Sequence, residues 1–220
     1  YWEISMFYSS KMLSALATAL CLTLVGCGGG GGDSPAPGPT AEGVYGGTLT
    51  GSSSSNFQML VLENDEFWAM YGTQTSAQFL VAGFLQGTGA SNSGTYTSSD
   101  VRDFGFNPAR AGTANATYNA AAKTISGSVA ATAGTVTFSG GPIAGSLYNY
   151  STPALPSSIS GSWSLTTLTG EGVSLNVSSA GAFTATSSFG CAFSGTMLPR
   201  PAGKNVFNVS LTFGPSPCVL

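Results

Sequence analysis

Short runs of alternating apolar and polar residues, punctuated by Gly, Ser and Asn, fill the chain from residue 43 onward. Alternation with a period of two is typical of β-strands, and no stretch here shows the 3.6-residue stripe of an amphipathic helix. The pattern predicts strands near residues 43–50, 56–62, 67–72, 78–87, 94–98, 112–118, 124–130 and 134–139.

Residues 57–71 give the clearest hairpin. Their two arms alternate aromatic or aliphatic residues with polar ones, and Asn64 and Asp65 lie between the arms. Both residue types tolerate the positive φ angles that tight hairpin turns require. We expect the turn at these two residues.

The fold class predicted is all-β. Eight antiparallel strands within residues 43–145 suit a small up-and-down barrel, which closes its own sheet and leaves no edge. A two-sheet sandwich would give much the same sequence, so both architectures stay open.

A second β unit is expected at residues 159–220. Residues 146–158 contain two prolines and no charge, and they form the predicted connector. Beyond it the alternation predicts strands near residues 159–167, 172–177, 182–186, 191–198 and 205–213. Five strands fall short of a full barrel, so we expect this unit to be incomplete, with an open sheet edge.

A faint internal repeat links the two units. Residues 43–45 precede Thr-Leu-Thr-Gly at 48–51, and residues 161–163 precede the same four letters at 167–170. Ser-Gly-Thr occurs at 93–95 and again at 194–196. The preserved order favours duplication, with chance in a Ser/Thr/Gly-rich chain as the alternative.

The N-terminal 26 residues have the layout of a secretory signal helix. Lys11 precedes an apolar run at residues 12–26, and small residues end it. A membrane-spanning helix is the alternative, but it needs about 20 apolar residues. Residues 1–5 precede the first Met and are expected to be non-native.

The last residues of this apolar run resemble the bacterial lipobox. Leu24, Val25 and Gly26 stand before Cys27 in the order of that motif. The resemblance implies cleavage after Gly26, lipid on the Cys27 sulfur and the lipoprotein processing and sorting machinery as partners. Gly28, where inner-membrane lipoproteins carry Asp, favours the outer membrane. The resemblance therefore predicts a cell-envelope protein attached to a membrane by lipid.

Residues 27–42 read as a tether after the lipidated cysteine. A glycine run at 28–32 is followed by a proline-rich segment that leans toward extended conformations. Without a preceding strand and a Lys-Ser/Thr ending, the glycines do not match a phosphate-binding loop.

Cys191 and Cys218 remain once the signal peptide and the lipidated cysteine are set aside. An even pair in an exported chain predicts a disulfide. A turn near residues 201–205 would bring both cysteines to the open end of one hairpin, and the bridge would stabilise the fold by about 3 kcal/mol. Unpaired or metal-binding thiols are the alternative.

Charge and composition exclude several function classes. Only 7% of the residues are charged, the net charge is −3 and the chain has no His. Nucleic-acid binding needs clustered positive charge, and the Ser-His-Asp triad and most zinc sites need His. We expect no cofactor and no metal. Acidic residues cluster at Glu63, Asp65, Glu66, Asp100 and Asp103, which leaves a carboxylate hydrolase as a minor alternative.

Lipobox, tether and β units together resemble Gram-negative lipoproteins with lipocalin-like or transferrin-binding-protein-like barrels. That resemblance implies a non-enzymatic module that binds a small apolar ligand or an envelope protein. A structural or surface-display lipoprotein is the alternative. Six aromatic residues are candidates to line an interior: Phe57, Phe67, Trp68, Tyr71, Phe79 and Phe84.

Overall fold

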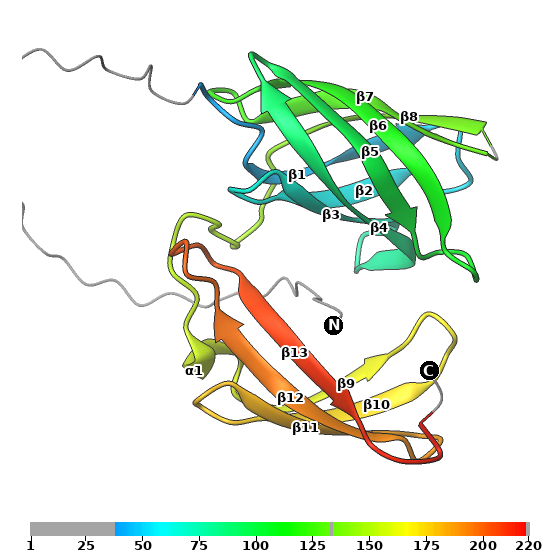
Figure 1. The fold of residues 1–220 in the computed structure, drawn as a ribbon, viewed down its shortest axis with the longest axis vertical. Coiled ribbons are helices and arrows are strands. Elements are labelled where there is room, and N and C mark those ends of the chain that lie inside the picture. The colour runs from blue at the N-terminus through cyan, green and yellow to red at the C-terminus, as the bar shows by residue number, and fades with distance from the viewer. Residues whose placement is uncertain (1–37, 133, 219–220) are drawn as a thin grey trace, which may run out of the picture.

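The computed structural model describes residues 38–132 and 134–218 of the 220-residue chain. These residues form a closed eight-stranded antiparallel barrel followed by an open five-stranded antiparallel sheet (Figure 1). The all-β prediction is confirmed, and the first unit is a barrel rather than a sandwich.

The barrel is an up-and-down meander in which each strand pairs with the next and the last pairs with the first. Six of its strands lie within three residues of their predicted bounds, whereas β4 and β5 run further. The strands are β1 (Gly43–Thr50), β2 (Asn56–Val61), β3 (Glu66–Gln74), β4 (Phe79–Asn92), β5 (Thr95–Asp103), β6 (Arg110–Asn119), β7 (Thr124–Ala131) and β8 (Gly134–Gly141).

Alternate residues of each strand face the barrel interior. On β2 these are Phe57, Met59 and Val61, and on β3 they include Phe67 and Ala69; all five are buried. Removing a large apolar side chain from water stabilises the fold by about 1.5–3 kcal/mol. The alternation in the sequence therefore encodes which face of the sheet becomes the core.

The predicted hairpin turn joins β2 to β3. The N–H of Leu62 donates to the carbonyl of Glu66 at 2.8 Å, and the N–H of Asp65 donates to that of Leu62 at 3.0 Å. Asp65 adopts φ 61°, as expected, whereas Asn64 keeps a negative φ. A single residue with a positive φ angle is enough to form this turn, because the turn carries one extra residue on one of its two strands.

The second unit begins with a short helix that the alternation did not predict, α1 (Pro156–Ile159). Its sheet has the order β13-β12-β11-β10-β9, and one face carries a separate buried cluster. The strands are β9 (Gly161–Thr166), β10 (Gly172–Val177), β11 (Ala182–Ser187), β12 (Ala192–Pro199) and β13 (Phe207–Phe213).

The loop between β12 and β13 contacts the barrel. Val206 is buried against Leu60 and Leu62 on the outside of the barrel. Arg200 forms an ion pair with Glu63 at 2.7 Å, next to this cluster. The second unit is thus seated on the end of the barrel that carries the β2–β3 turn.

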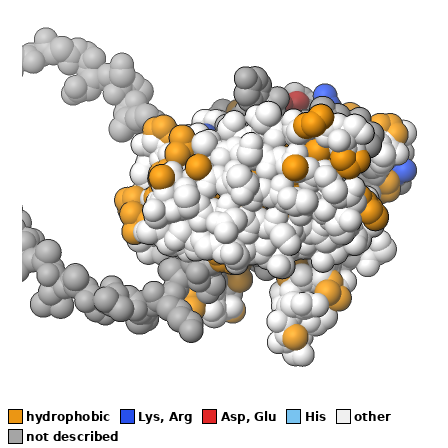
Figure 2. Space-filling view, turned by 90° about the horizontal axis from the view of Figure 1, so that it is seen from below, with side chains coloured by type: hydrophobic (Ala, Val, Ile, Leu, Met, Phe, Trp, Pro, Cys, Tyr) orange, Lys and Arg blue, Asp and Glu red, His pale blue; other side chains and the backbone are white. Residues whose placement is uncertain are grey.

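No helix within the described ranges combines the length and apolarity that crossing a bilayer would need. Charged residues are few in the sequence, and on the face that Figure 2 shows, hydrophobic side chains are scattered and few charged ones are visible. The predicted signal helix lies outside the described residues.

Candidate ligand-binding site

The interior of the first barrel contains a cavity of about 280 Å³. Its wall is mostly apolar because the inward positions alternate large side chains with alanines. Residues of the wall include Phe57, Met59, Val61, Phe67, Ala69, Leu85, Ala114, Ala116, Ile125, Val129 and Phe138. Small residues on β6 leave the space that the aromatic residues of β2 and β3 do not fill.

One end of the barrel is closed by hydrogen-bonded tyrosines. Tyr45 donates its hydroxyl hydrogen bond to the carbonyl of Ala41 at 2.6 Å, and Tyr118 donates to Pro39 at 2.6 Å. Tyr96 donates to the carbonyl of Asp65, also at 2.6 Å. Burial raises the pKa of Tyr45 to about 12, with smaller contributions from Tyr118 and Glu42. The Tyr45 hydroxyl therefore keeps its proton and its donated hydrogen bond well into the alkaline range.

Asp65 joins this closed end to the incoming chain. Its carboxylate accepts hydrogen bonds from the Ser91 N–H at 2.9 Å and from the Ser91 hydroxyl at 2.6 Å. The Ser91 oxygen in turn accepts from the N–H of Ala41. Ala41 is fully buried, so the end of the predicted tether packs against the barrel.

The opposite end of the cavity opens between the loops that follow β1 and β5. Gly51, Ser52, Ser53, Phe106 and Arg110 line this mouth. The Arg110 guanidinium lies 3.6 Å from the centre of the Phe106 ring, within cation–π range. The mouth thus carries the Arg110 guanidinium and, from the Asp103 side chain, a carboxylate, above a mostly apolar channel.

Tyr71 is fixed beside the mouth by Asp103. Its hydroxyl donates to the Asp103 carboxylate at 2.8 Å, and that carboxylate also accepts from the N–H of Gly105. Burial, followed by this hydrogen bond, raises the pKa of Tyr71 well above its ordinary value. A Cβ atom at Gly83 or Gly105 would overlap the Tyr71 hydroxyl, so the two glycines provide its space.

Three of the six candidate aromatic residues reach the cavity, namely Phe57, Phe67 and Tyr71. Trp68 packs in the cluster between the two units, and Phe84 stacks on Phe104 with ring centres 4.8 Å apart. Phe79 does not line the cavity. Arg110 and Phe106 were missed as site residues, since the residues between two predicted strands were read as a loop.

The acidic residues of the β2–β3 turn have structural partners. Glu63 pairs with Arg200, and Glu66 accepts a hydrogen bond from the Trp68 indole at 2.9 Å. Asp65 is held by Ser91, as described above. Within the described residues no group of three or more Cys, Asp or Glu side chains could hold a metal ion.

The second unit has its own apolar hollow, of about 550 Å³, on one face of its sheet. Val173, Leu175, Phe183, Met197 and Val209 contribute to its lining. Because this sheet is open, the hollow is a groove rather than an enclosed interior.

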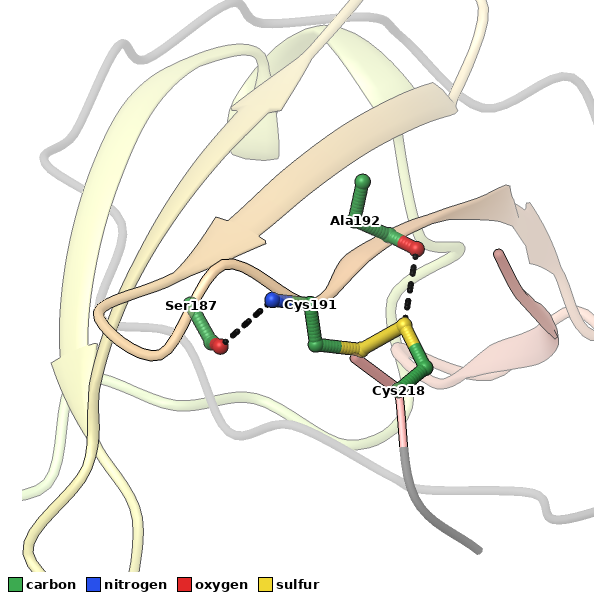
Figure 3. The surroundings of a disulfide bond; sticks show 4 residues. All are labelled: Ser187, Cys191, Ala192 and Cys218. Atoms are coloured by element: carbon green, nitrogen blue, oxygen red, sulfur yellow. Dashed lines mark hydrogen bonds between the residues drawn. A yellow bond between two sulfur atoms is a disulfide. The ribbon is translucent and has the colours of Figure 1, made fainter. Parts of the chain in front are cut away.

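The disulfide between Cys191 and Cys218 is present, with the two Cα atoms 4.5 Å apart (Figure 3). It joins the start of β12 to the segment after β13, at the open end of the predicted hairpin. The N–H of Cys191 also donates to the Ser187 hydroxyl at 3.1 Å. Leu24, Val25, Gly26 and Cys27 lie outside the described residues.

Comparisons with protein families, with curated proteins and with solved structures gave no match to the chain.

Proposed function

We propose that this chain is a lipid-anchored protein of the bacterial cell envelope, favoured in the outer membrane, and that its first barrel binds a small apolar ligand. The cavity of about 280 Å³ inside the barrel is the observation that carries the binding proposal. Its size lies just below the usual range for small-molecule sites, about 300–1000 Å³, so the guest should be small.

The physical reason is the chemistry of the wall. An apolar cavity offers water few hydrogen-bond partners, so it stays dry and its lining atoms lack contacts on one side. An apolar molecule that enters the cavity restores those contacts and moves its own apolar surface out of water. The wall of aromatic, aliphatic and alanine side chains suits such a guest.

The two ends of the barrel differ: one is closed and the other is open to a ligand. The tyrosine hydrogen bonds close one end, and the second unit covers the outside of the same end. A ligand therefore enters past Arg110 at the mouth. A guest with a negatively charged or carbonyl group would place that group beside the guanidinium, with its apolar part inside.

The roles of the carboxylate side chains in the barrel support a non-enzymatic function. The carboxylates of the β2–β3 turn hold the closed end and the contact between the units. They lie at the end of the barrel away from the mouth. Asp103, the carboxylate beside the mouth, accepts hydrogen bonds from Tyr71 and Gly105.

The fluorescence of an apolar probe, 1-anilinonaphthalene-8-sulfonate, tests the cavity. We expect Ala116→Leu to weaken probe binding at least tenfold, because Ala116 lines the cavity and the larger side chain occupies its space. Thr117→Leu is the matched control: the neighbouring Thr117 is exposed on the same strand, so its affinity should stay unchanged. Equal affinities in both variants would remove the first barrel as the binding site.

The membrane anchor is tested by radiolabelled palmitate. The label should enter the wild-type chain and a Cys21→Ala variant, and should be absent from Cys27→Ala, because only Cys27 stands at the end of the lipobox. The Cys191–Cys218 disulfide is consistent with export, since such bridges persist in oxidising compartments. Label retained by Cys27→Ala would rule out this anchor.

A further inference from the structure

The second sheet repeats the first four strands of the barrel in the same pairing register. Starting from the pair Val61–Phe67 in the barrel and Val177–Phe183 in the sheet, each neighbouring pair has its counterpart. The matched pairs are Gly43–Val61 with Gly161–Val177, Tyr45–Met59 with Trp163–Leu175, Met59–Ala69 with Leu175–Ala185, and Ala69–Leu85 with Ala185–Phe193.

The turn between β2 and β3 also has the same hydrogen bonds as the turn between β10 and β11. In the barrel, the N–H of Leu62 donates to Glu66 and that of Asp65 donates back to Leu62. In the sheet, Ser178 donates to Ala182 at 2.8 Å and Gly181 donates to Ser178 at 3.0 Å. Asp65 and Gly181 both have positive φ, at 61° and 83°.

An aromatic ring over a glycine recurs in both units. Phe67 pairs with Gly87 and Phe183 pairs with Gly195 across the third and fourth strands. A Cβ on Gly87 would lie 2.7 Å from the Phe67 ring, and one on Gly195 would lie 2.9 Å from the Phe183 ring. Side-chain packing is thus repeated along with the backbone.

A fourth correspondence lies where each unit begins. Tyr45 donates to the carbonyl of Ala41, and the Trp163 indole donates to the carbonyl of Ile159, each four residues back. The sequence repeat at 43–45 and 161–163 falls on these equivalent positions. The repeat at 48–51 and 167–170 is offset by one residue, because Leu49 and Thr167 are the equivalent donors to Ser55 and Glu171. The third match is not at equivalent positions either, because residues 93–95 form the β4–β5 turn region whereas residues 194–196 lie inside β12.

By this correspondence β9 is the equivalent of β1 and β13 that of β5. In the barrel, β8 pairs with β1 and β6 pairs with β5. In the described residues, β9 pairs only with β10 and β13 only with β12. All six residues of β9 are exposed, Trp163 and Leu165 among them. The two outer strands lack the neighbours that their counterparts have.

We propose that the second unit is the first five strands of a second eight-stranded barrel, closed by a three-stranded antiparallel continuation of this polypeptide after β13. The continuation pairs with β13 on one side and with β9 on the other, as β6 and β8 do in the first barrel. A second copy of the chain would instead bring five strands and a ten-stranded ring.

The proposed continuation of three strands has a defined pattern of side chains. Its inward positions alternate with exposed ones and are small or apolar, as Ala114, Ala116 and Ile125 are on β6 and β7. With those strands in place, the groove of about 550 Å³ becomes the interior of the second barrel.

The backbone of β9 provides a residue-level test. The N–H of Thr167 donates to the carbonyl of Glu171, so the backbone amide of Thr167 points toward the β10 side of the strand. Alternate residues of an antiparallel strand bond to the same neighbour. Trp163 and Leu165 therefore direct their amides to β10, and Ser162, Ser164 and Thr166 direct theirs to the opposite side.

The experiment is to determine the reading frame downstream of the Leu220 codon and to measure amide hydrogen exchange in the complete polypeptide. We expect three further alternating segments, and protection of the Ser162, Ser164 and Thr166 amides comparable to that of Trp163 and Leu165. In the 220-residue chain the first three amides should exchange at least a hundredfold faster than the other two.

Two results would overturn the proposal. One is a reading frame that ends at Leu220 or continues without three strands; protection of the β9 edge in a dimer would then assign it to a second copy. The other is fast exchange of Ser162, Ser164 and Thr166 in the complete polypeptide while Trp163 and Leu165 stay protected.

Discussion

Three tyrosines close one end of the first barrel. Tyr45, Tyr96 and Tyr118 each bury an aromatic ring in the core and donate from the hydroxyl to a backbone carbonyl. A buried hydroxyl without a partner would cost free energy, so each ring also fixes the carbonyl that it contacts. In this way single side chains hold the incoming segment and the β2–β3 turn against the barrel.

The pKa of Tyr45 leads to a prediction about alkaline stability. Because burial raises it to about 12, the folded state keeps its proton while the unfolded state loses it near pH 10. Stability is therefore complete below pH 10 and falls as the pH rises toward 12, by up to about 1.4 kcal/mol per pH unit for this residue.

Urea unfolding at several pH values measures this effect. Tyr45→Phe should be less stable by about 1 kcal/mol at pH 7, for the lost hydrogen bond. Its deficit should shrink above pH 10, because the phenylalanine has no proton to lose. A deficit that stays constant to pH 12 would contradict the role given to burial.

Some of the site could be predicted from single residues and some could not. Six aromatic residues were candidates to line an interior, and the structure places Phe57, Phe67 and Tyr71 on the cavity. Trp68 and Phe84 point outward, because they occupy the alternate positions of their strands. Arg110 and Phe106 acquire a role only once the barrel closes and the β5–β6 loop borders the mouth.

At the level of elements, the strands of both units follow the alternation closely, except that β4 and β5 run further than predicted. The prediction ended β4 at residue 87, whereas the strand continues to Asn92. Gly87 and Gly89 lie beneath the rings of Phe67 and Tyr96, where a Cβ would collide. Such glycines serve a close approach between strands, and that contact is invisible in a local pattern.

Gly87→Ala tests this account of β4. The added methyl would meet the buried Phe67 ring at 2.7 Å, so we expect a loss of about 1–3 kcal/mol in the free energy of unfolding. Gly141→Ala is the control, since its Cβ would find ordinary contacts of 3.5 Å or more. Equal stability of the two variants in urea titrations would show that Gly87 is an ordinary strand residue.

At the scale of the whole molecule, the contact between the units leaves the mouth of the first barrel open. Val206 packs on Leu60 and Leu62, and Arg200 pairs with Glu63, all at the closed end. The count of strands in each unit followed from the sequence. The contact between the two units did not follow from the sequence, because it is made by outward-facing residues that have the pattern of ordinary surface residues.

Native mass spectrometry of the chain purified from cell envelopes is the most direct test of a ligand in the first barrel. After the lipid anchor is accounted for, we predict a population of excess mass that solvent extraction removes and that Ala116→Leu lacks. A chain that always shows its bare mass, in wild type and in Thr117→Leu alike, would contradict the binding function and favour a display role.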